Sequence, residues 1–331
     1  MMPAARCVEF SAALQVRVVR DTLPQLAAGQ VLVQTECSAI SAGTELLAYR
    51  GQLPPDMALD DSIAALQRPV HYPLRYGYAA VGTVVACGSA VAPEWDGRRV
   101  LAFHPHASHF IAQPQDLLPV PASISSAAAA LLPNIETAVN LLHDGQPLLG
   151  ERVAVFGQGV VGLLTTALLA LVPLASLTTF DVLPERRAQA LLFGATRSLD
   201  PQDAQLQNLD ADLAYELSGN PAALDAALQA TGAFGRVVVG SWYGQKTAPL
   251  NLGGRFHRAR QTISSSQVSS IGAQLSARWS KARRLQEAWR MCALVQPERL
   301  VSHRYALEDA PAAYRLLDKE PAAALQVLLI Y

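Results

Sequence analysis

Three glycines follow a short apolar run with the spacing that a bound dinucleotide requires. The segment Gly157-Gln158-Gly159-Val160-Val161-Gly162 forms a GxGxxG motif between the strand-like run VAVF and the helix-like run LLTTALLA. In this motif the first glycine allows a tight turn, the second lets the backbone approach a pyrophosphate, and the third lets helix and strand pack closely. The helix N-terminus adds N–H groups and a positive dipole end. We expect a dinucleotide site here; the alternative is a tight turn without a ligand.

An acidic residue follows the motif at the distance that a ribose contact needs. Asp181 lies 19 residues after Gly162, at the end of the run LTTF. A carboxylate there would bind the ribose 2′-hydroxyl and repel a 2′-phosphate, so we expect NAD, with NADP possible. Arg186 and Arg187 lie close enough to weaken that preference, although solvated positions on a helix are the preferred interpretation for both.

Further polar residues follow later strand-like runs of the same region. Ser218 follows the run ADLAYEL, and Gly240 and Ser241 follow GRVVV. The carboxyl ends of parallel strands form the ligand-binding edge of such sheets, so we expect these residues to touch the cofactor. Ser266, in the run ISSSQ, is expected near the nicotinamide ribose.

Histidines and arginines each form a conspicuous cluster. His104, His106 and His109 form HxHxxH, for which we weigh metal binding, acid–base chemistry by His104 or His106, and ordinary packing, the last ahead. The basic cluster would favour an anionic substrate if it faced a cleft, but a solvated surface is the preferred interpretation. Its members are Arg255, Arg258, Arg260, Arg278, Lys281, Arg283 and Arg284.

The elements around these residues fall into two kinds. Residues up to about 125 read as short strands and turns, with a proline-rich segment at 52–72 that we expect to line a substrate pocket. Residues 123–145 have helical spacing, with Ser125 or Ser126 as the cap and Gly145 at the end. From residue 151 strands alternate with helices, which predicts a doubly wound parallel sheet, and Gly194 and Gly232 are expected to end two helices. Residues 302–331 read as strand, helix, strand.

Composition excludes several classes of protein. The 331 residues are 51% hydrophobic with a formal net charge of −1 and no long run of one sign, which argues against nucleic-acid or polybasic membrane binding. Cys7, Cys37, Cys87 and Cys292 are scattered, which fits a reducing, cytoplasmic compartment. The apolar stretch 160–177 is interrupted by glycine and proline, so a buried helix is preferred to a membrane span.

A strand-rich lobe, a nucleotide-binding unit and a short return segment follow one another, and this order resembles the medium-chain dehydrogenase/reductase superfamily over nearly the whole chain. The runs AISAGTELLAYRG, YPLRYGYAAVGTVVACG and GERVAVFGQGVVGLLTTALLA carry the resemblance. The first two look most like the subgroup named for bacteriochlorophyllide hydroxyethyl dehydrogenases. The resemblance implies an α/β fold: a Rossmann domain at 135–266 and a GroES-like β-rich catalytic domain at 1–134 and 267–331. It also implies a small-molecule substrate in a cleft between the domains, and a homodimer.

The zinc ligands of the alcohol dehydrogenases in that superfamily have no counterpart here. The cysteine position falls around Ser41 or Ala42, the usual Gly-His-Glu reads Gly77-Tyr78-Ala79, and the third ligand position falls near Pro133. The structural zinc loop is absent as well. Zinc needs thiolate, imidazole or carboxylate donors, so no zinc is expected at this position.

The resemblance also assigns catalytic candidates. Tyr78 matches the metal-ligating histidine; it either donates a proton to the substrate or only fills the vacated volume, with packing slightly ahead. Thr44 matches a proton-relaying hydroxyl residue and could act with Ser41, while Glu45 matches an acid that supports a ligand and here would bind backbone amides or an arginine. Thr137 matches a residue abutting the nicotinamide.

These residues predict an NAD(P)-dependent, zinc-independent oxidoreductase that moves hydride between nicotinamide and a carbonyl or alcohol carbon. An enone or quinone reductase is the nearest alternative, because an enolate oxygen can be held by hydrogen bonds alone. A dinucleotide-binding protein without turnover is a third possibility.

Overall fold

Contacts in the computed structural model divide the chain into two units. The structure describes residues 3–54, 66–67 and 69–331, so part of the proline-rich segment expected to line a pocket lies outside the described residues. One unit comprises Met1–Leu132 with Gln296–Tyr331, and the other Pro133–Val295. Residues 267–295, which we expected in the catalytic domain, thus group with the nucleotide-binding unit, where helix α7 (Lys281–Val295) contacts α4 (Val160–Leu169).

The first unit is built on a sheet of seven strands and a separate hairpin. The order is β14-β15-β3-β4-β5-β7, with β6 paired to β3 off that path, and β1 pairs with β2 alone. Its strands are β1 (Ala4–Ala12), β2 (Gln15–Thr22), β3 (Val31–Ile40), β4 (Ala80–Cys87), β5 (Arg99–Ala102), β6 (His109–Ala112), β7 (Leu117–Pro119), β14 (Val301–Ala306) and β15 (Gln326–Ile330).

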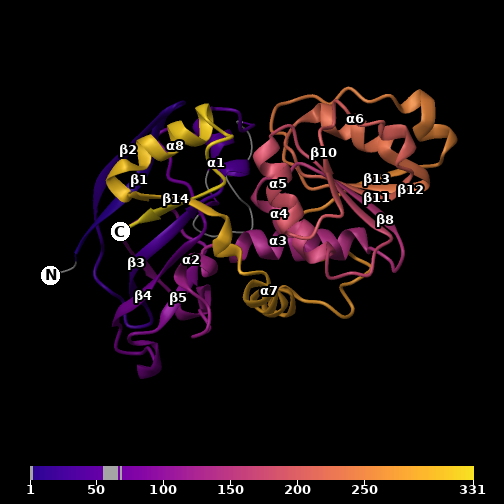
Figure 1. Ribbon diagram of the computed structural model, residues 1–331. Helices are drawn as coiled ribbons and strands as arrows, with labels where there is room; N and C mark the ends of the chain where they lie inside the picture. The colour runs from indigo at the N-terminus through magenta and orange to yellow at the C-terminus, as the bar shows by residue number, and fades with distance from the viewer. Residues whose placement is uncertain (1–2, 55–65, 68) are drawn as a thin grey trace. The chain divides into compact units, whose positions relative to one another are not determined.

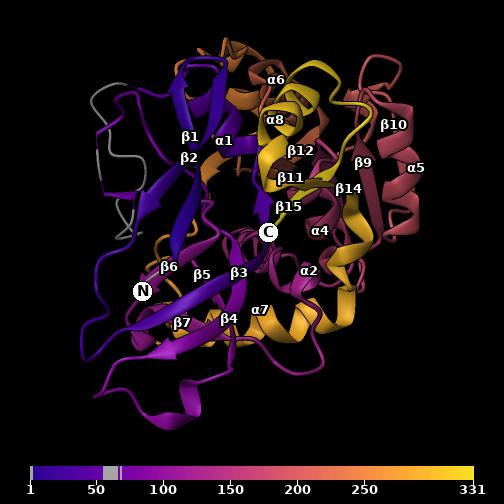
Figure 2. The same ribbon diagram turned by 90° about the vertical axis from the view of Figure 1, so that its left-hand side faces the viewer.

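The end of the chain completes the core of this first unit. β15 pairs antiparallel with β3, so the strand-helix-strand ending predicted from the sequence is confirmed, with α8 (Ala310–Lys319) between its strands. Figures 1 and 2 show α8 and β14, in yellow, beside the indigo strands of the N-terminal region. Helix α1 (Ala42–Tyr49) packs with α8 on a shared apolar cluster that includes Phe10, Tyr76 and Tyr314.

The second unit has a doubly wound parallel sheet, as predicted. The order is β10-β9-β8-β11-β12-β13, and every neighbouring pair runs parallel. The strands are β8 (Arg152–Phe156), β9 (Ser176–Phe180), β10 (Arg197–Leu199), β11 (Ala211–Glu216), β12 (Thr231–Val239) and β13 (Thr262–Ser265).

Alternate residues of the central strand β8 face different helices, which explains its continuous apolar run. Val153 and Val155 pack in one cluster with α3 (Leu132–Gly145) and α4, while Ala154 and Phe156 pack in another with α6 (Pro221–Ala230). Figure 1 shows these helices around the sheet together with α5 (Pro184–Leu192). The remaining helical turns are short: η2 (Pro93–Trp95), η3 (Pro114–Asp116), η4 (Leu206–Asn208), η5 (Leu252–Phe256), η6 (Pro297–Leu300) and η7 (Leu307–Asp309).

Two helix ends differ from the sequence prediction. The helix expected over residues 123–145 is divided into α2 (Ser126–Ala129) and α3, with the break just before Pro133, which cannot continue a hydrogen-bonded helix in its interior. Ser125 caps α2 by accepting a hydrogen bond from Ala128 N at 3.1 Å. Gly232 does not cap α6; it lies within β12, whereas Gly194 follows α5 at a φ of 97°, as expected for a helix-ending glycine.

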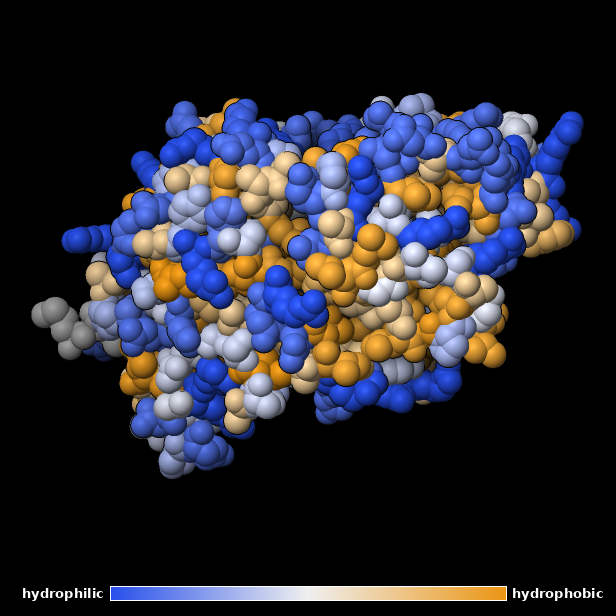
Figure 3. Space-filling view, in the orientation of Figure 1, coloured by the Kyte–Doolittle hydropathy of each residue, from blue (hydrophilic) through white to orange (hydrophobic). Residues whose placement is uncertain are grey.

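The surface mixes hydrophilic and hydrophobic residues, and the cysteines form no disulfides. On the face shown in Figure 3, hydrophilic and hydrophobic residues are interspersed. All four cysteines are free, and burial raises the pKa of the Cys37 thiol to about 12. Among the described residues, no helix is long and apolar enough to cross a membrane.

Arg284 corrects our prediction of a solvated basic cluster. Its side chain is fully buried on α7, where Nε donates to Glu136 Oε1 at 3.0 Å and Nη1 donates to Asn140 Oδ1 at 2.5 Å. Nη1 also donates to the Ser270 carbonyl at 2.9 Å, and Nη2 donates to the carbonyl of Val268. Burial raises the pKa of Glu136, with the Arg284 charge opposing that shift. The buried pair thus joins α7, α3 and the segment after β13.

Replacing Arg284 by Met should lower the free energy of unfolding by about 3–5 kcal/mol, because a buried carboxylate and two carbonyls lose their donor. Urea denaturation followed by circular dichroism measures this. Arg290→Met is the matched control on the same helix, and it should leave stability unchanged. Arg290 is exposed, and among the described residues its ion pair is with Glu287, three positions away. Equal stability of the two variants would contradict the structural role of Arg284.

Candidate functional site

Three side-chain hydroxyl groups of the first unit lie together around the positions that match the zinc ligands of alcohol dehydrogenases. Tyr78 follows the backbone turn at Gly77, and its hydroxyl donates a hydrogen bond to Ser41 Oγ. The same hydroxyl lies 3.4 Å from Thr44 Oγ1. Ser41 occupies the N-cap position of α1 without a side-chain capping bond, and Thr44 lies in the first turn, so the start of one helix supplies both partners. The structure therefore brings together the three catalytic candidates, which we call the hydroxyl cluster.

Glu45 follows Thr44 in the first turn of α1 and is fully buried. Its Oε1 accepts from the backbone N–H of Ser41 at 2.7 Å, as the sequence interpretation allowed. No arginine contact is recorded for it among the described residues. Instead, Oε2 lies 2.9 Å from His106 Nε2 and accepts a hydrogen bond from the Tyr314 hydroxyl. Burial, with the neighbouring carboxylate adding to it, raises the pKa of Tyr314 far above its ordinary value, so this phenol stays a donor.

The histidine cluster of the sequence does not converge on one point. His106 is fully buried, whereas the ring of His104 stacks on Phe110 with centroids 4.2 Å apart, and His109 Nδ1 lies 3.2 Å from Ser108 Oγ. Burial lowers the pKa of His104 to about 4, so its ring is neutral at pH 7. Across the part of the chain that the structure describes, no three His, Cys, Asp or Glu side chains group as a metal site would require.

The residues at the expected zinc position are a poor fit for the metal. Ser41 and Tyr78 offer neutral hydroxyls that are hydrogen-bonded to each other, and Ala42 and Ala79 offer no side-chain donor. Structural and catalytic zinc sites use thiolate, imidazole or carboxylate ligands. Glu45, the carboxylate of this region, has both oxygens engaged by protein donors.

The glycine motif of the second unit has the geometry predicted for it. Gly157 has a φ of 91°, and a Cβ there would lie 2.5 Å from Ser218 Cα. A Cβ on Gly162 would lie 2.0 Å from the Gly157 carbonyl oxygen, so strand and helix can approach only without one. At Gly159, by contrast, the nearest atom to an added Cβ is Arg186 Nη1 at 3.9 Å. Protein packing thus explains why Gly157 and Gly162 are glycines. Gly159, the second glycine of the motif, instead leaves open space beside the N-terminus of α4.

Val160 and Val161 begin α4, so their N–H groups belong to the first turn, which has no intrahelical acceptors. Gly159 precedes them as the N-cap and has no side chain that could satisfy those donors. The helix N-terminus therefore remains available to an anionic group.

Asp181 supports the glycine loop from the end of β9. Its Oδ2 accepts from Gln158 N at 2.7 Å and its Oδ1 accepts from Leu183 N at 2.9 Å. Each carboxylate oxygen has two lone pairs, so capacity for a ribose hydroxyl remains. Arg187 is not solvated as expected, because it donates to the Asp181 carbonyl at 2.8 Å and pairs with Asp200 at 3.1 Å. Arg186 lies nearer the open space at Gly159.

Glu216 is a buried group that the sequence analysis missed. This carboxylate ends β11, where Oε1 accepts from Ser218 N at 2.8 Å and Oε2 accepts from the Tyr243 hydroxyl at 2.5 Å. Ser241 Oγ in turn accepts from Gly219 N at 2.8 Å. Glu216 thus fixes the loop that packs against Gly157. The sequence did contain one indication of this role, because Glu216 is the acidic residue at the end of the otherwise apolar run LAYE.

The remaining cofactor candidates have protein partners of their own. Gly240 gives room to leucine side chains, since a Cβ there would lie 2.6 Å from Leu217 Cδ2. Ser266 Oγ donates to Asp144 Oδ2 at 2.7 Å, and Thr137 Oγ1 donates to the Pro133 carbonyl of its own helix at 2.9 Å. Their cofactor contacts stay predictions.

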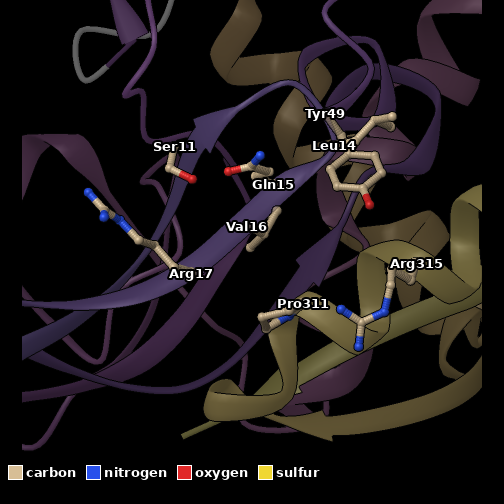
Figure 4. Close-up of a pocket in the computed structure, with 8 residues that line it drawn as sticks. All are labelled: Ser11, Leu14, Gln15, Val16, Arg17, Tyr49, Pro311 and Arg315. Atoms are coloured by element: carbon tan, nitrogen blue, oxygen red, sulfur yellow. The ribbon is translucent and has the colours of Figure 1, made fainter.

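A separate hollow of about 440 Å³ lies in the first unit between the β1–β2 hairpin and α8. Figure 4 shows Leu14 and Tyr49 on one side of it and Pro311 and Arg315 on the other. It contains none of the predicted site residues.

Comparison with known proteins points to dehydrogenases, in agreement with the fold and the glycine motif. Residues 160–287 match the family model of the zinc-binding dehydrogenases. The uncharacterized zinc-type alcohol dehydrogenase-like protein YphC of Escherichia coli K12 is 26% identical over 77% of this chain and 80% of its own length.

Two solved structures share the whole fold. The L-idonate 5-dehydrogenase of Escherichia coli K-12 superposes with a TM-score of 0.81 at 18% identity, covering 100% of this chain and 99% of the other. The RspB alcohol dehydrogenase of Escherichia coli CFT073, complexed with NADH, has a TM-score of 0.79 at 17% identity and covers 99% of both chains.

A parallel-sheet unit and a β-rich unit that the end of the chain completes form the fold that this chain shares with these two structures. The family match over residues 160–287 and the likeness to YphC make this chain similar to the zinc-type dehydrogenases of the medium-chain dehydrogenase/reductase superfamily, as the sequence resemblance indicated.

Gly162→Ala should destabilise the second unit by about 2–3 kcal/mol, because the added methyl group meets a backbone oxygen that cannot move aside. Gly159→Ala should cost less than about 1 kcal/mol, since its methyl group enters open space. Thermal and urea unfolding of both variants measures the difference. A Gly159 variant as unstable as the Gly162 variant would contradict the assignment of open space to the second glycine.

Proposed function

We propose that this protein is an NAD(P)-dependent, zinc-independent oxidoreductase acting on a carbonyl or alcohol substrate. The hydroxyl cluster carries the proposal, because it provides proton donors at the position where relatives would hold a metal. The similarity to zinc-binding dehydrogenases supports hydride transfer as the reaction type.

The second unit would hold the cofactor. The open space at Gly159, the first turn of α4 and the Asp181 carboxylate fit a pyrophosphate and a ribose hydroxyl. The related RspB structure, which is complexed with NADH, supports a nicotinamide cofactor. A bound nicotinamide would supply or accept the hydride. NAD is the proposed cofactor, and Arg186 beside the loop leaves NADP use open.

The hydroxyl cluster would handle the substrate oxygen and its proton. A tyrosine hydroxyl carries one hydrogen, which here is directed at Ser41 Oγ. When a carbonyl oxygen arrives, the Tyr78 hydrogen can turn to it while the Ser41 hydroxyl donates to the Tyr78 oxygen. Tyr78 would then give its proton to the forming alkoxide, and Thr44 stands within 3.4 Å to stabilise the phenol oxygen. In the oxidative direction the same groups would remove the alcohol proton.

An enone or quinone reductase is the second candidate. The same hydroxyl donors could hold an enolate oxygen, and that chemistry needs no metal. Assays with enones, quinones, aldehydes and secondary alcohols separate the two. Tight NADH binding without turnover of any of them would favour a non-catalytic dinucleotide-binding protein.

Tyr78→Phe should lower kcat by about 10²–10⁴-fold, because it removes the proposed proton donor while keeping the ring. Steady-state kinetics on the best substrate of the panel measures this. Tyr305→Phe makes the same change on strand β14, outside the hydroxyl cluster, and should retain full activity.

Full activity of Tyr78→Phe would leave that residue a packing role only. Metal analysis complements this test: the enzyme should keep its activity after chelation. Stoichiometric zinc whose removal abolishes turnover would overturn zinc independence.

Asp181→Asn should raise NADPH affinity relative to NADH by about 10-fold, because it removes a charge that repels the 2′-phosphate. Fluorescence titration with both cofactors gives this ratio, in which any general weakening of the loop cancels. Asp203→Asn removes an exposed charge of the same unit and should leave the ratio unchanged. An unchanged ratio in the Asp181 variant would contradict its role in cofactor selection.

A further inference from the structure

His106 touches both chain segments that supply the hydroxyl cluster. It lies between β5 and β6, away in sequence from α1, which carries Ser41 and Thr44, and from the turn that carries Tyr78. Its side chain has no exposed surface, so it acts only through its protein neighbours.

The contact with the first segment runs through Glu45. His106 Nε2 lies 2.9 Å from Glu45 Oε2, and Glu45 Oε1 accepts from Ser41 N at 2.7 Å. An ionised carboxylate only accepts, so Nε2 is the donor in that form. The imidazole therefore orients the carboxylate that holds the backbone of Ser41, the residue whose hydroxyl accepts from Tyr78.

The contact with the second segment is steric and through the backbone. His106 N donates to the Tyr76 carbonyl at 3.3 Å. Gly77 has a φ of 108°, and a Cβ on it would lie 2.6 Å from His106 Nε2. The ring thus packs against Gly77, which directly precedes Tyr78, so closely that Gly77 could carry no side chain.

The opposite side of the ring is held as well. His106 Nδ1 lies 2.7 Å from Ser38 Oγ, which lies 2.8 Å from the Tyr331 hydroxyl. Tyr314 adds a second donor to the Glu45 oxygen that His106 contacts. With both ring nitrogens engaged and no solvent contact, the imidazole has one orientation.

We propose that His106 is a positioning residue that sets the separation between Tyr78 and the Ser41–Thr44 pair. It replaces, by contact with both segments, the fixed reference point that a shared metal ion gives in the zinc enzymes. This inference rests on the proposed function. Since misplacing a reacting group by about 1 Å can cost about 10²-fold in rate, loss of the imidazole should act on turnover rather than on cofactor binding.

A double-mutant cycle between His106 and Tyr78 tests the proposal. His106→Gln keeps a buried hydrogen-bonding side chain but not the ring, and should lower kcat by about 10-fold or more with the NADH dissociation constant unchanged. In the Tyr78→Phe background the same substitution should change kcat by less than about 2-fold, since residues that act as a unit are non-additive. Equal effects in both backgrounds would overturn the proposal.

Ser38→Ala and Tyr331→Phe provide a milder, matched pair in case the glutamine variant does not fold. Both remove a hydrogen bond of Ser38, but only Ser38→Ala removes the one to His106. Ser38→Ala should therefore lower kcat severalfold, and Tyr331→Phe should not. Equal kcat values for the two variants would count against the proposal.

A crystal structure of His106→Gln or Ser38→Ala decides the question without any assay. The proposal requires that Tyr78 Oη separates from Ser41 Oγ beyond hydrogen-bond distance, or that α1 shifts at Ser41. An unchanged hydroxyl cluster overturns it. Absence of turnover in the wild-type enzyme would sink the proposed function alone, because the crystal structure would still test the positioning role.

Discussion

A buried carboxylate organises the first unit. Glu45 receives a backbone amide, an imidazole and a phenol from three separate parts of the chain. A buried charge is stable only when its lone pairs are used, so each donor must arrive at a defined place. The start of α1, the segment before β6 and helix α8 are therefore fixed relative to one another, and the hydroxyl cluster stands on that fixed base.

The second unit depends on buried charge in the same way. Glu216 fixes the loop after β11 against the first motif glycine, and Arg284 joins α3, α7 and the backbone after β13. Ser218 bonds directly to Glu216, while Ser266 shares the Asn140 amide with the Arg284 network. Two of the cofactor candidates are thus connected to buried charged groups.

Local patterns in the sequence were enough for the Rossmann unit, because a GxGxxG between a strand and a helix depends on neighbouring residues alone. The alternating strands and helices gave the parallel sheet for the same reason. The long-range partners could not be predicted this way. His106 stood in a conspicuous histidine cluster and Arg284 in a basic one, yet each is paired with a residue more than fifty positions away. Residue spacing carries no information about such pairings. Burial overturned the solvated interpretation of Arg284, whereas the buried His106 agrees with the packing interpretation.

The hydrogen bonds of Glu45 also bear on how readily a metal site could be built at this position. Exchanging Tyr78 for histidine would restore a ligand type, but the carboxylate that might support it already serves His106, Tyr314 and Ser41. The new imidazole would also follow Gly77, whose α-carbon is packed against the existing ring. Building a zinc site at this position would therefore need several coordinated substitutions, which a ligand-by-ligand comparison of sequences does not reveal.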